Sequence, residues 1–338
     1  MKKKWLVGFI CILVVGAMVV AGCGGGTDKK AEGDKKTDGK KLQVYFATGT
    51  PGGVYQMLGA GMAKVVNEKN PGYEIVATTP AQVAQSPTML ETGGAALGIG
   101  MACMFDRAYN GKGEFEGKAH KKLRSVLGMY DNGMVYLTLK DNPLSNVKDI
   151  SGKTFASTAT NVILVKAVMQ AANVDPASVQ VRVMSYQQSA EALTDGVAQA
   201  TVLTGFPRNG TLDSVASTKG VRFLEIDEET KTKFDKDNPL WKCMEIQPSI
   251  YTGVVNEKPV WGPTIFTVLY TSADASDDFV YNVTKAIIEN VGEIEKIHPA
   301  GKDMTLETTA RYLKDGIMKV SDMHPGAVKY FKEKGVIK

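Results

Sequence analysis

The chain has 338 residues, and its charges nearly balance, with 40 lysines and arginines against 36 aspartates and glutamates. The positive excess lies near the N-terminus. Of a net charge of +4, three lysines at 2–4 supply three, and the lysine-rich stretch at 28–41 supplies a further two, which leaves about −1 for 42–338. A near-neutral body excludes a nucleic-acid-binding protein, because such proteins present a basic surface to phosphates.

The first 22 residues have the arrangement of an export signal. Lysines precede an almost uninterrupted apolar stretch at 5–20, and small residues then lead into Cys23. This order predicts a lipoprotein signal peptide over 1–22, with the thiol of Cys23 as the lipidation site. The alternative, a retained transmembrane helix, is disfavoured because the apolar stretch falls short of the ~20 residues that span a bilayer.

The stretch at 23–41 contains no large apolar residue and is dominated by glycine, lysine and acidic residues. Such a composition cannot bury enough surface to order itself, so we expect a flexible tether that begins at the lipidated Cys23. The chain would then lie outside the cytoplasm, either on the outer face of the cytoplasmic membrane or within a periplasm. Outside the cytoplasm, Cys103 and Cys243 are the two cysteines left that could form a disulfide. Their spacing alone does not decide whether they form one.

The body at 42–338 exceeds one typical core of ~100–200 residues, so we expect two lobes. An alternating strand at 42–46 is followed by a helix whose apolar stripe runs from Val54 to Val66. Further strands are expected at 74–79 and 95–100, with a helix at 83–91 between them. Strands that alternate with helices are typical of an α/β lobe.

A second α/β series begins beyond a break near residue 140, which follows a strand at 135–139. Its strands are expected at 154–157, 179–183 and 200–204. Its helices are expected at 162–172 and 185–194. The helix at 162–172 is apolar nearly all round, which predicts burial on both sides. Ser185 with Gln188 resembles a capping box at the start of the next helix.

Near the C-terminus the pattern predicts two strands and then helices. The expected elements are strands at 250–255 and 265–270, a helix carrying Phe279, Val280, Val283 and Ile287, a helix with a stripe of Leu306, Ala310, Leu313 and Ile317, and a helix at 328–332. We therefore expect lobe 1 over 42–140, lobe 2 over 141–255, and a return to lobe 1 with C-terminal helices over 256–338.

Residues for catalysis or metal binding do not assemble in the sequence. The three histidines, His120, His298 and His324, have no second histidine or cysteine at metal-ligand spacing, and no nucleophile elbow is present. An enzyme would need a converging acid, base or nucleophile that these residues do not provide. We expect no enzymatic activity, no metal and no cofactor.

The loop at 49–53 joins the first strand to the first helix, where unpaired N–H groups and the helix dipole favour anions. Its glycines, Gly52 and Gly53 among them, permit close backbone approach, Thr50 offers a hydroxyl, and Tyr55 is placed to cover a ligand. A plain tight turn is the alternative interpretation.

Two loops of the second lobe offer groups that would face the loop at 49–53 across a cleft. Thr160 and Asn161 precede a helix, where each is suited either to cap it or to hold a carboxylate. Thr204, Gly205 and Arg208 follow a strand, and ligands of open α/β sheets gather at the carboxyl ends of strands. Arg208 is the best-placed cation for a carboxylate, and a solvated surface arginine is the alternative.

The order and spacing of several motifs resemble the TAXI family of solute receptors that serve TRAP-type secondary transporters. The matching segments are Gly49-Thr50-Pro51-Gly52-Gly53-Val54-Tyr55 with Gly59, Ala108-Tyr109-Asn110-Gly111, Phe115-Glu116-Gly117-Lys118, Leu123-Arg124-Ser125-Val126, Ala190-Glu191-Ala192-Leu193 with Asp195-Gly196, Tyr281 to Asn290, His298-Pro299-Ala300 and His324-Pro325-Gly326-Ala327.

This resemblance implies an α/β, two-lobed fold of the periplasmic-binding-protein type II class, with a hinge between the lobes. It implies a monomeric receptor that delivers a small carboxylate, such as glutamate, glutamine or a dicarboxylate, to small and large membrane subunits that are separate or fused. Import would be driven by an ion gradient. The alternative is an extracytoplasmic sensor or surface lipoprotein that uses this fold without a transporter.

The chain departs from the family pattern at the expected ligand wall. Met101 and Cys103 stand where polar residues are common, Gln56 replaces a second tyrosine, and the loop with Tyr130 and Asn132 lacks the usual glutamine or glutamate. These changes predict a less polar wall, suited to a carboxylate with a hydrocarbon or aromatic tail. The expected ligand-binding residues are Thr50, Gly52, Gly53, Tyr55, Met101, Cys103, Tyr130, Asn132, Thr160, Asn161, Thr204, Gly205 and Arg208.

Overall fold

The computed structural model describes residues 41–49, 53–70, 72–80 and 85–338. The predictions for the signal peptide, the lipidation of Cys23, the tether, Thr50 and Gly52 lie outside the described residues. None of the helices in the described part of the chain has the length and apolarity needed to cross a membrane.

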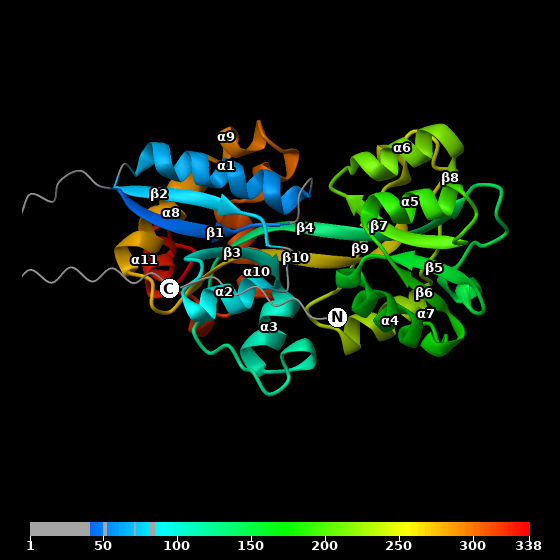
Figure 1. Ribbon diagram of the computed structural model, residues 1–338, viewed down its shortest axis with the longest axis horizontal. Coiled ribbons are helices and arrows are strands. Elements are labelled where there is room, and N and C mark those ends of the chain that lie inside the picture. Colours follow the sequence, from blue (N-terminus) through cyan, green and yellow to red (C-terminus); the bar gives the residue numbers. More distant parts are fainter. Residues whose placement is uncertain (1–40, 50–52, 71, 81–84) are drawn as a thin grey trace, which may run out of the picture. The chain divides into compact units, whose positions relative to one another are not determined.

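One mixed sheet organises the described chain (Figure 1), with the strand order β2-β1-β3-β10-β4-β7-β5-β6. β8 pairs with β4, and β9 pairs with β10. The strands are β1 (Leu42–Ala47), β2 (Tyr73–Thr78), β3 (Leu97–Met101), β4 (Leu123–Leu139), β5 (Thr154–Ser157), β6 (Gln180–Val183), β7 (Ala200–Phe206), β8 (Val221–Phe223), β9 (Cys243–Ile246) and β10 (Val260–Ser272).

The long strands β4 and β10 join the two ends of this sheet. β1 lies parallel to β2 and β3 at the first end, and β5 lies parallel to β6 and β7 at the second end. β10 is antiparallel to both β3 and β4, and β4 is antiparallel to β7. Every connection through the sheet between the two ends therefore passes along β4 and β10.

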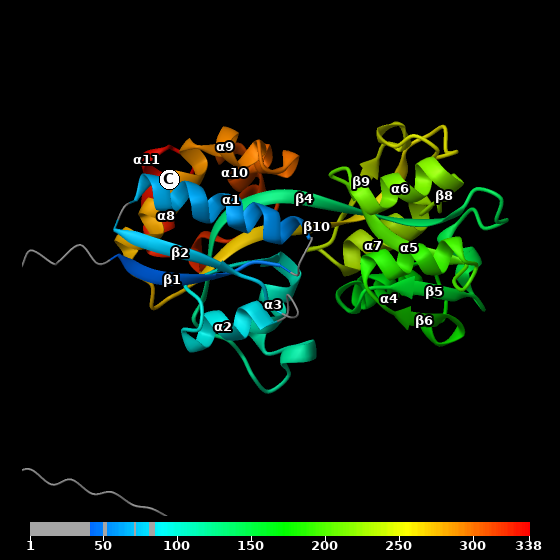
Figure 2. The same cartoon turned by 45° about the horizontal axis from the view of Figure 1, so that its top comes forward.

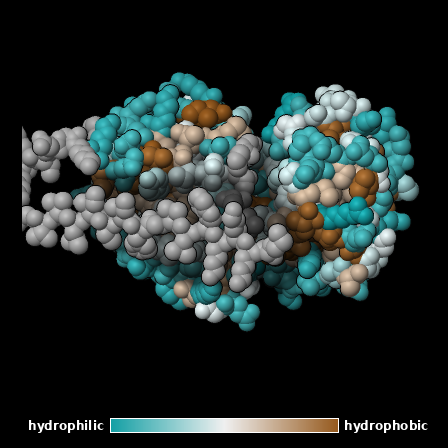
Figure 3. Space-filling view, viewed as in Figure 1, coloured by the Kyte–Doolittle hydropathy of each residue, from teal (hydrophilic) through white to brown (hydrophobic). Residues whose placement is uncertain are grey.

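Helices pack around each end of the sheet, as Figure 2 shows for α1, α8 and α11 near β1 and for α4 to α7 near β5. Their bounds are α1 (Val54–Lys69), α2 (Ser86–Thr92), α3 (Ala102–Asn110), α4 (Val162–Ala171), α5 (Tyr186–Thr194), α6 (Gly210–Lys219), α7 (Glu228–Asp237), α8 (Asp277–Glu289), α9 (Val291–Glu295), α10 (Leu306–Lys314) and α11 (Pro325–Glu333). In Figure 3 the visible face is mostly hydrophilic, with scattered apolar patches.

Most of the predicted elements are confirmed. The first strand and helix, the strands at 154–157 and 265–270, and the helix carrying Phe279 have the expected type. The capping box is also present, because Ser185 accepts a hydrogen bond from the backbone of Gln188 while the Gln188 side chain accepts one from the backbone of Ser185. These elements have strong local periodicity or capping chemistry, which the chain sequence displays directly.

Two strand predictions are wrong. The segment 250–255 is not a strand, because Val254 makes only one isolated bridge, to Val221, and the strand that pairs with β10 is β9. β4 starts at Leu123 rather than at 135, so Tyr130 and Asn132 lie within a strand and not in a loop. Asp131 is accommodated there because the hydroxyl of Tyr312 donates to it at 2.8 Å.

One predicted burial pattern is also wrong. α4 is not buried on both sides, because Lys166 and Gln170 are exposed on one face. On α10 (Leu306–Lys314) the expected apolar stripe is present and half-buried, and the fully buried residues of the helix are Thr309 and Tyr312. Thr309 accepts a hydrogen bond from the backbone of Gly128 in β4 at 3.1 Å, so contacts with the sheet decide which face of this helix is buried.

Ile246 of β9 fills a socket of glycines where β4, β7 and β10 lie against one another. The side chain is 1% exposed. Its δ1 carbon occupies the place of a β-carbon at Gly133, and its γ carbons would lie only 3.1 and 3.0 Å from β-carbons at Gly205 and Gly262. A β-carbon at Gly262 would also overlap the carbonyl oxygen of Met134. The backbones of the strands can approach Ile246 this closely because these positions lack side chains.

We predict that Gly262→Ala destabilises the protein by about 1–3 kcal/mol, because the added methyl group forces the backbone of β10 away from β4. Gly292→Ala is the matched control, since no atom lies within 4 Å of a β-carbon built there. In that helix the alanine should leave stability unchanged or raise it by up to about 1 kcal/mol. Urea unfolding followed by circular dichroism measures both changes, and equal midpoints would contradict the socket.

Candidate functional site

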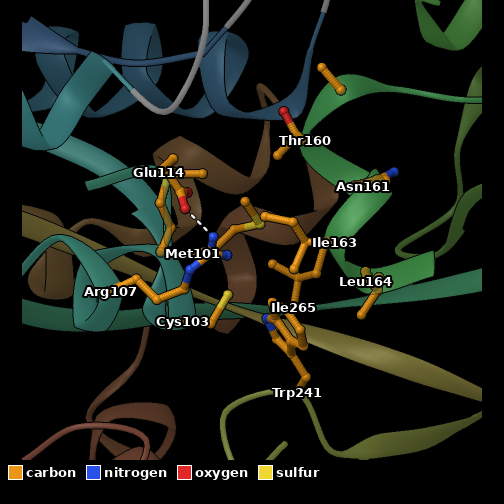
Figure 4. Close-up of a pocket in the computed structure, with 12 residues that line it drawn as sticks. Met101, Cys103, Arg107, Glu114, Thr160, Asn161, Ile163, Leu164, Trp241 and Ile265 are labelled. Carbon is orange, nitrogen blue, oxygen red and sulfur yellow. Dashed lines mark hydrogen bonds and ion pairs between the residues drawn. The ribbon is translucent and has the colours of Figure 1, made fainter. Parts of the chain in front are cut away.

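A cavity of about 180 Å³ lies where the start of α3, the start of α4, β10 and the segment before β9 meet. Most of its lining is apolar, and its polar members come from α3, the turn after α3, and the turn that leads into α4 (Figure 4). The lining residues are Met101, Cys103, Met104, Arg107, Glu114, Ala159, Thr160, Asn161, Ile163, Leu164, Trp241 and Ile265.

The register of three strands places further side chains beside this cavity. Thr267 of β10 is opposite Met101 of β3 on one side and opposite Tyr130 of β4 on the other, and Ile265 is opposite Asn132. Side chains of directly opposed residues lie on the same face of a sheet. Because Met101 and Ile265 line the cavity, these rows continue its floor across β3, β10 and β4.

Hydroxyl groups from both ends of the sheet extend this floor. The hydroxyl of Tyr55 lies 3.2 Å from that of Thr267, and its ring meets the ring of Tyr130 edge-on with centroids 6.3 Å apart. In α5, the hydroxyl of Tyr186 accepts a hydrogen bond from Nδ2 of Asn161 at 3.1 Å and lies 3.4 Å from Oγ1 of Thr204. The contacts around Tyr55 and those around Tyr186 are thus made by uncharged polar groups.

Three buried polar atoms at this site have no hydrogen-bond partner among the described residues: the hydroxyl of Tyr130, Oδ1 of Asn132 and Nε1 of Trp241. A buried polar group without a partner costs about 1–3 kcal/mol. Together the three offer an acceptor amide oxygen, a donor indole N–H and a hydroxyl that serves as either. A bound solute with both donors and acceptors would satisfy them.

Burial keeps the other titratable groups of the site uncharged. It raises the pKa of Tyr55, Tyr130 and Tyr186 above the ordinary value of a phenol, and it raises the pKa of the Cys103 thiol to about 12. The acidic and basic side chains of the described cavity lining are Glu114 and Arg107. No group of histidine, cysteine and acidic residues suited to a metal ion occurs among the residues that the structure describes.

Arg107 and Glu114 form an ion pair at the wall of the cavity (Figure 4), between Nη2 of the arginine and Oε2 of the glutamate. Arg107 lies near the end of α3, and Glu114 lies on the short 3-10 turn Gly113–Phe115. Their side chains are 21% and 31% exposed. The pair thus brings a partly accessible guanidinium to a mostly apolar cavity.

The structure brings together most of the residues expected at the site. Met101, Cys103, Thr160 and Asn161 line the cavity, whereas Tyr55, Tyr130, Asn132 and Thr204 belong to the adjoining floor and hydroxyl groups. Gly53 caps the N-terminus of α1 without a side-chain hydrogen bond. That any of these residues binds a ligand stays a prediction.

Two expected residues lie apart from the cavity lining. Arg208 is 58% exposed and is held by Asp213, with Nη2 to carboxylate oxygen distances of 2.7 and 2.9 Å. Gly205 belongs to the socket that Ile246 fills. Of the two roles open to Asn161, side-chain capping of α4 is not observed. Asn161 occupies the N-cap position, but its side chain bonds to Tyr186, and Oγ1 of Thr158 accepts from the backbone N–H of Asn161 at 3.3 Å.

Several lining residues were missed by sequence reasoning. Arg107 and Glu114 lie in and just after a helix, α3, that was not predicted, and Trp241 lies in a loop without a motif. The strand-to-helix junction at Met101 could have directed attention to α3, because such junctions are frequent ligand sites in α/β proteins. No sequence signal would have selected Trp241.

The chain matches the NMT1-like family over residues 46–335. It is similar to the solved structure of the periplasmic aliphatic sulphonate binding protein SsuA from Escherichia coli, with a TM-score of 0.50, 12% sequence identity, and coverage of 87% of this chain and 84% of that chain. It is also similar to the putative sulfonate ABC transporter periplasmic sulfonate-binding protein SsuA from Methylobacillus flagellatus KT, with a TM-score of 0.50, 11% identity, and coverage of 88% and 96%. The fold is thus the two-lobed α/β fold of periplasmic binding proteins.

We predict that Tyr130→Phe raises stability at neutral pH by up to about 1–3 kcal/mol, because it removes a buried hydroxyl that has no hydrogen-bond partner among the described residues. Tyr186→Phe should cost about 1–3 kcal/mol, since it removes two hydroxyl contacts at ~0.5–1.5 kcal/mol each. Thermal unfolding of both variants at neutral pH measures the difference. A larger loss in Tyr130→Phe than in Tyr186→Phe would contradict the assigned contacts.

We also predict that stability falls as pH rises above about 10. The pKa of each buried tyrosine is raised by folding, so the unfolded chain releases these protons first, near the ordinary phenol pKa of ~10. The stabilisation is therefore complete below that pH and is lost above it. Tyr130→Phe removes one such group, so its melting temperature should decline less steeply between pH 9 and 12. An unchanged slope would contradict the raised pKa of Tyr130.

Proposed function

This chain belongs to the NMT1-like family, and on that premise we propose that it is an extracytoplasmic solute receptor that serves a membrane transporter. The observation that carries the proposal is the cavity, lined by residues from both ends of a sheet that β4 and β10 connect. In a two-lobed fold, a solute that contacts both lobes stabilises the closed form. Delivery of that closed form to membrane subunits would complete the receptor's role.

We propose a small organic anion as the solute, held by Arg107 through its carboxylate or an equivalent acidic group. Arginine presents a planar fork of donors that matches a carboxylate. The apolar lining would contact the hydrocarbon or aromatic part of the solute, and Tyr130, Asn132 and Trp241 offer unpartnered polar atoms to a further polar group. The volume of about 180 Å³ favours a small solute.

For the partner, we propose the small and large membrane subunits of a TRAP-type transporter, separate or fused, on the motifs that resemble the TAXI family. The two similar solved structures are sulfonate-binding proteins, and one is assigned to an ABC transporter, which supplies the competing hypothesis. The TRAP-type and ABC-type hypotheses can be separated by measuring uptake. The assay uses cells or vesicles that carry the receptor and its membrane subunits. TRAP-type import stops when an ionophore removes the ion gradient, whereas ABC-type import stops when ATP is withdrawn.

We propose that Cys23 carries the lipid that holds the receptor at the membrane. Cys23→Ala should move the protein from the membrane fraction to the soluble extracytoplasmic fraction without changing solute affinity. Cys103→Ala is the matched control, because a cysteine in the folded body should leave the location unchanged. Retention of Cys23→Ala at the membrane would contradict lipidation there.

We predict that Arg107→Ala weakens binding of the cognate acid by about 10- to 100-fold, since hydrogen bonds to charged groups contribute ~1.5–3 kcal/mol. Arg208→Ala should change affinity less than about twofold. The acid is first found by a thermal-shift screen of amino acids, keto acids, aromatic acids and alkyl sulfonates. Calorimetry then compares both variants, and a large effect confined to Arg208→Ala would move the anion site to Arg208.

A receptor and a sensor without a transporter bind solutes in the same way, so binding alone does not separate them. Deletion of the receptor gene should abolish uptake of the acid identified by the screen if the protein serves a transporter. Normal uptake in the deletion strain would instead support the sensor or surface-lipoprotein alternative. Recovery of the bound acid unchanged from the purified protein would argue against an enzyme.

A further inference from the structure

The cavity contains its own carboxylate beside the arginine that we assign to the solute. Glu114 contacts the guanidinium of Arg107, and both side chains line the cavity (Figure 4). A solute carboxylate that approaches Arg107 therefore meets a group of the same charge already in place. The affinity of the cavity for an anion then depends on whether the Glu114 carboxylate stays paired with Arg107 or moves away from it.

The turn that carries Glu114 is built against Arg107. The backbone N–H of Lys112 donates to the carbonyl oxygen of Arg107 at 2.8 Å. Gly113 has a φ of +61°, and a β-carbon there would collide with the guanidinium, so the arginine lies directly over this glycine. Phe115 is buried and meets the ring of His120 edge-on at 5.4 Å, which anchors the far side of the turn.

The ion pair is accessible enough to exchange. With side-chain exposures of 21% and 31%, Arg107 and Glu114 both reach solvent, and ion pairs near a protein surface are weak. The backbone of the turn can stay in place while the Glu114 side chain rotates toward solvent. The freed carboxylate would still lie beside the cavity and would repel a second negative charge on the solute.

We propose that Glu114 is an internal counter-ion of Arg107 that the solute's acidic group replaces, and that the freed Glu114 selects solutes with one negative charge over dianions. This inference rests on the proposed function, because it takes Arg107 as the anion-binding group. Glu114 then lowers affinity for every acid by competing for Arg107. It lowers affinity for dianions further by repulsion.

The first test measures access to Arg107 without any solute. Phenylglyoxal modifies accessible guanidinium groups, and peptide mass spectrometry follows the rate at the peptide that contains Arg107. Glu114→Gln should raise that rate about threefold or more. Glu116→Gln is the matched control, because Glu116 is exposed on the same segment and does not line the cavity. Equal rates in the wild type and both variants would overturn the proposal.

The second test measures selectivity, with butyrate as the monoanion and succinate as the dianion, by calorimetry at millimolar concentrations. In Glu114→Gln both acids should bind more tightly, and the ratio of succinate to butyrate affinity should rise about fivefold. Glu116→Gln should leave the ratio unchanged. An unchanged ratio in Glu114→Gln, or no detectable binding of either acid by that variant, would overturn the proposal.

These outcomes are separable from failure of the proposed function. If Arg107→Ala abolishes binding of the acid found by the screen while Glu114→Gln changes neither Arg107 reactivity nor selectivity, the receptor function stands and the counter-ion role fails. If Arg107→Ala has no effect on that binding, the assignment of Arg107 fails and the counter-ion role fails with it. Matching melting temperatures and circular dichroism spectra of the variants exclude unfolding as the cause.

Discussion

The close approach of β4, β7, β9 and β10 around Ile246 is the constraint on which the rest of the structure depends. β4 and β10 connect the two ends of the sheet, and they pack tightly there because Gly133 and Gly262 leave room for the isoleucine side chain. Asn132 precedes Gly133, and Ile265 lies opposite Asn132, so the packed crossing and the floor of the cavity share the same strands. A shift at this socket would therefore displace the site.

The same arrangement separates the neutral and charged parts of the site. The floor on β4 and β10 is buried, and burial raises the pKa of Tyr130, so that group takes part as an uncharged hydroxyl. Among the residues that the structure describes, the charged groups of the lining lie at the wall, where Arg107 and Glu114 both keep access to solvent. This division suits a solute with one acidic group near the wall and neutral polar or apolar groups over the floor.

Sequence reasoning succeeded where the structure is local. Helix α1 and the capping box at Ser185 depend on residues three or four apart, and both were predicted. It failed for β4, whose middle contains a polar run that reads as a loop, because the hydroxyl of Tyr312, far away in the sequence, binds Asp131 and Gly128 lies against the ring of the same tyrosine. The choice between Arg107 and Arg208 likewise depends on which of them lines the cavity, because each is paired with a carboxylate, and that follows from tertiary structure.

In the proposed receptor, the position of the unpartnered atoms would link solute binding to closure of the two lobes. Tyr130 and Asn132 belong to β4, which runs along the whole sheet, whereas Asn161 with Tyr186 belongs to the helices around its second end. A solute can favour the closed form only through contacts that the open form lacks. Contacts with β4 alone would bind the solute without closing the protein, so closure requires that the solute also reach the residues at the start of α4.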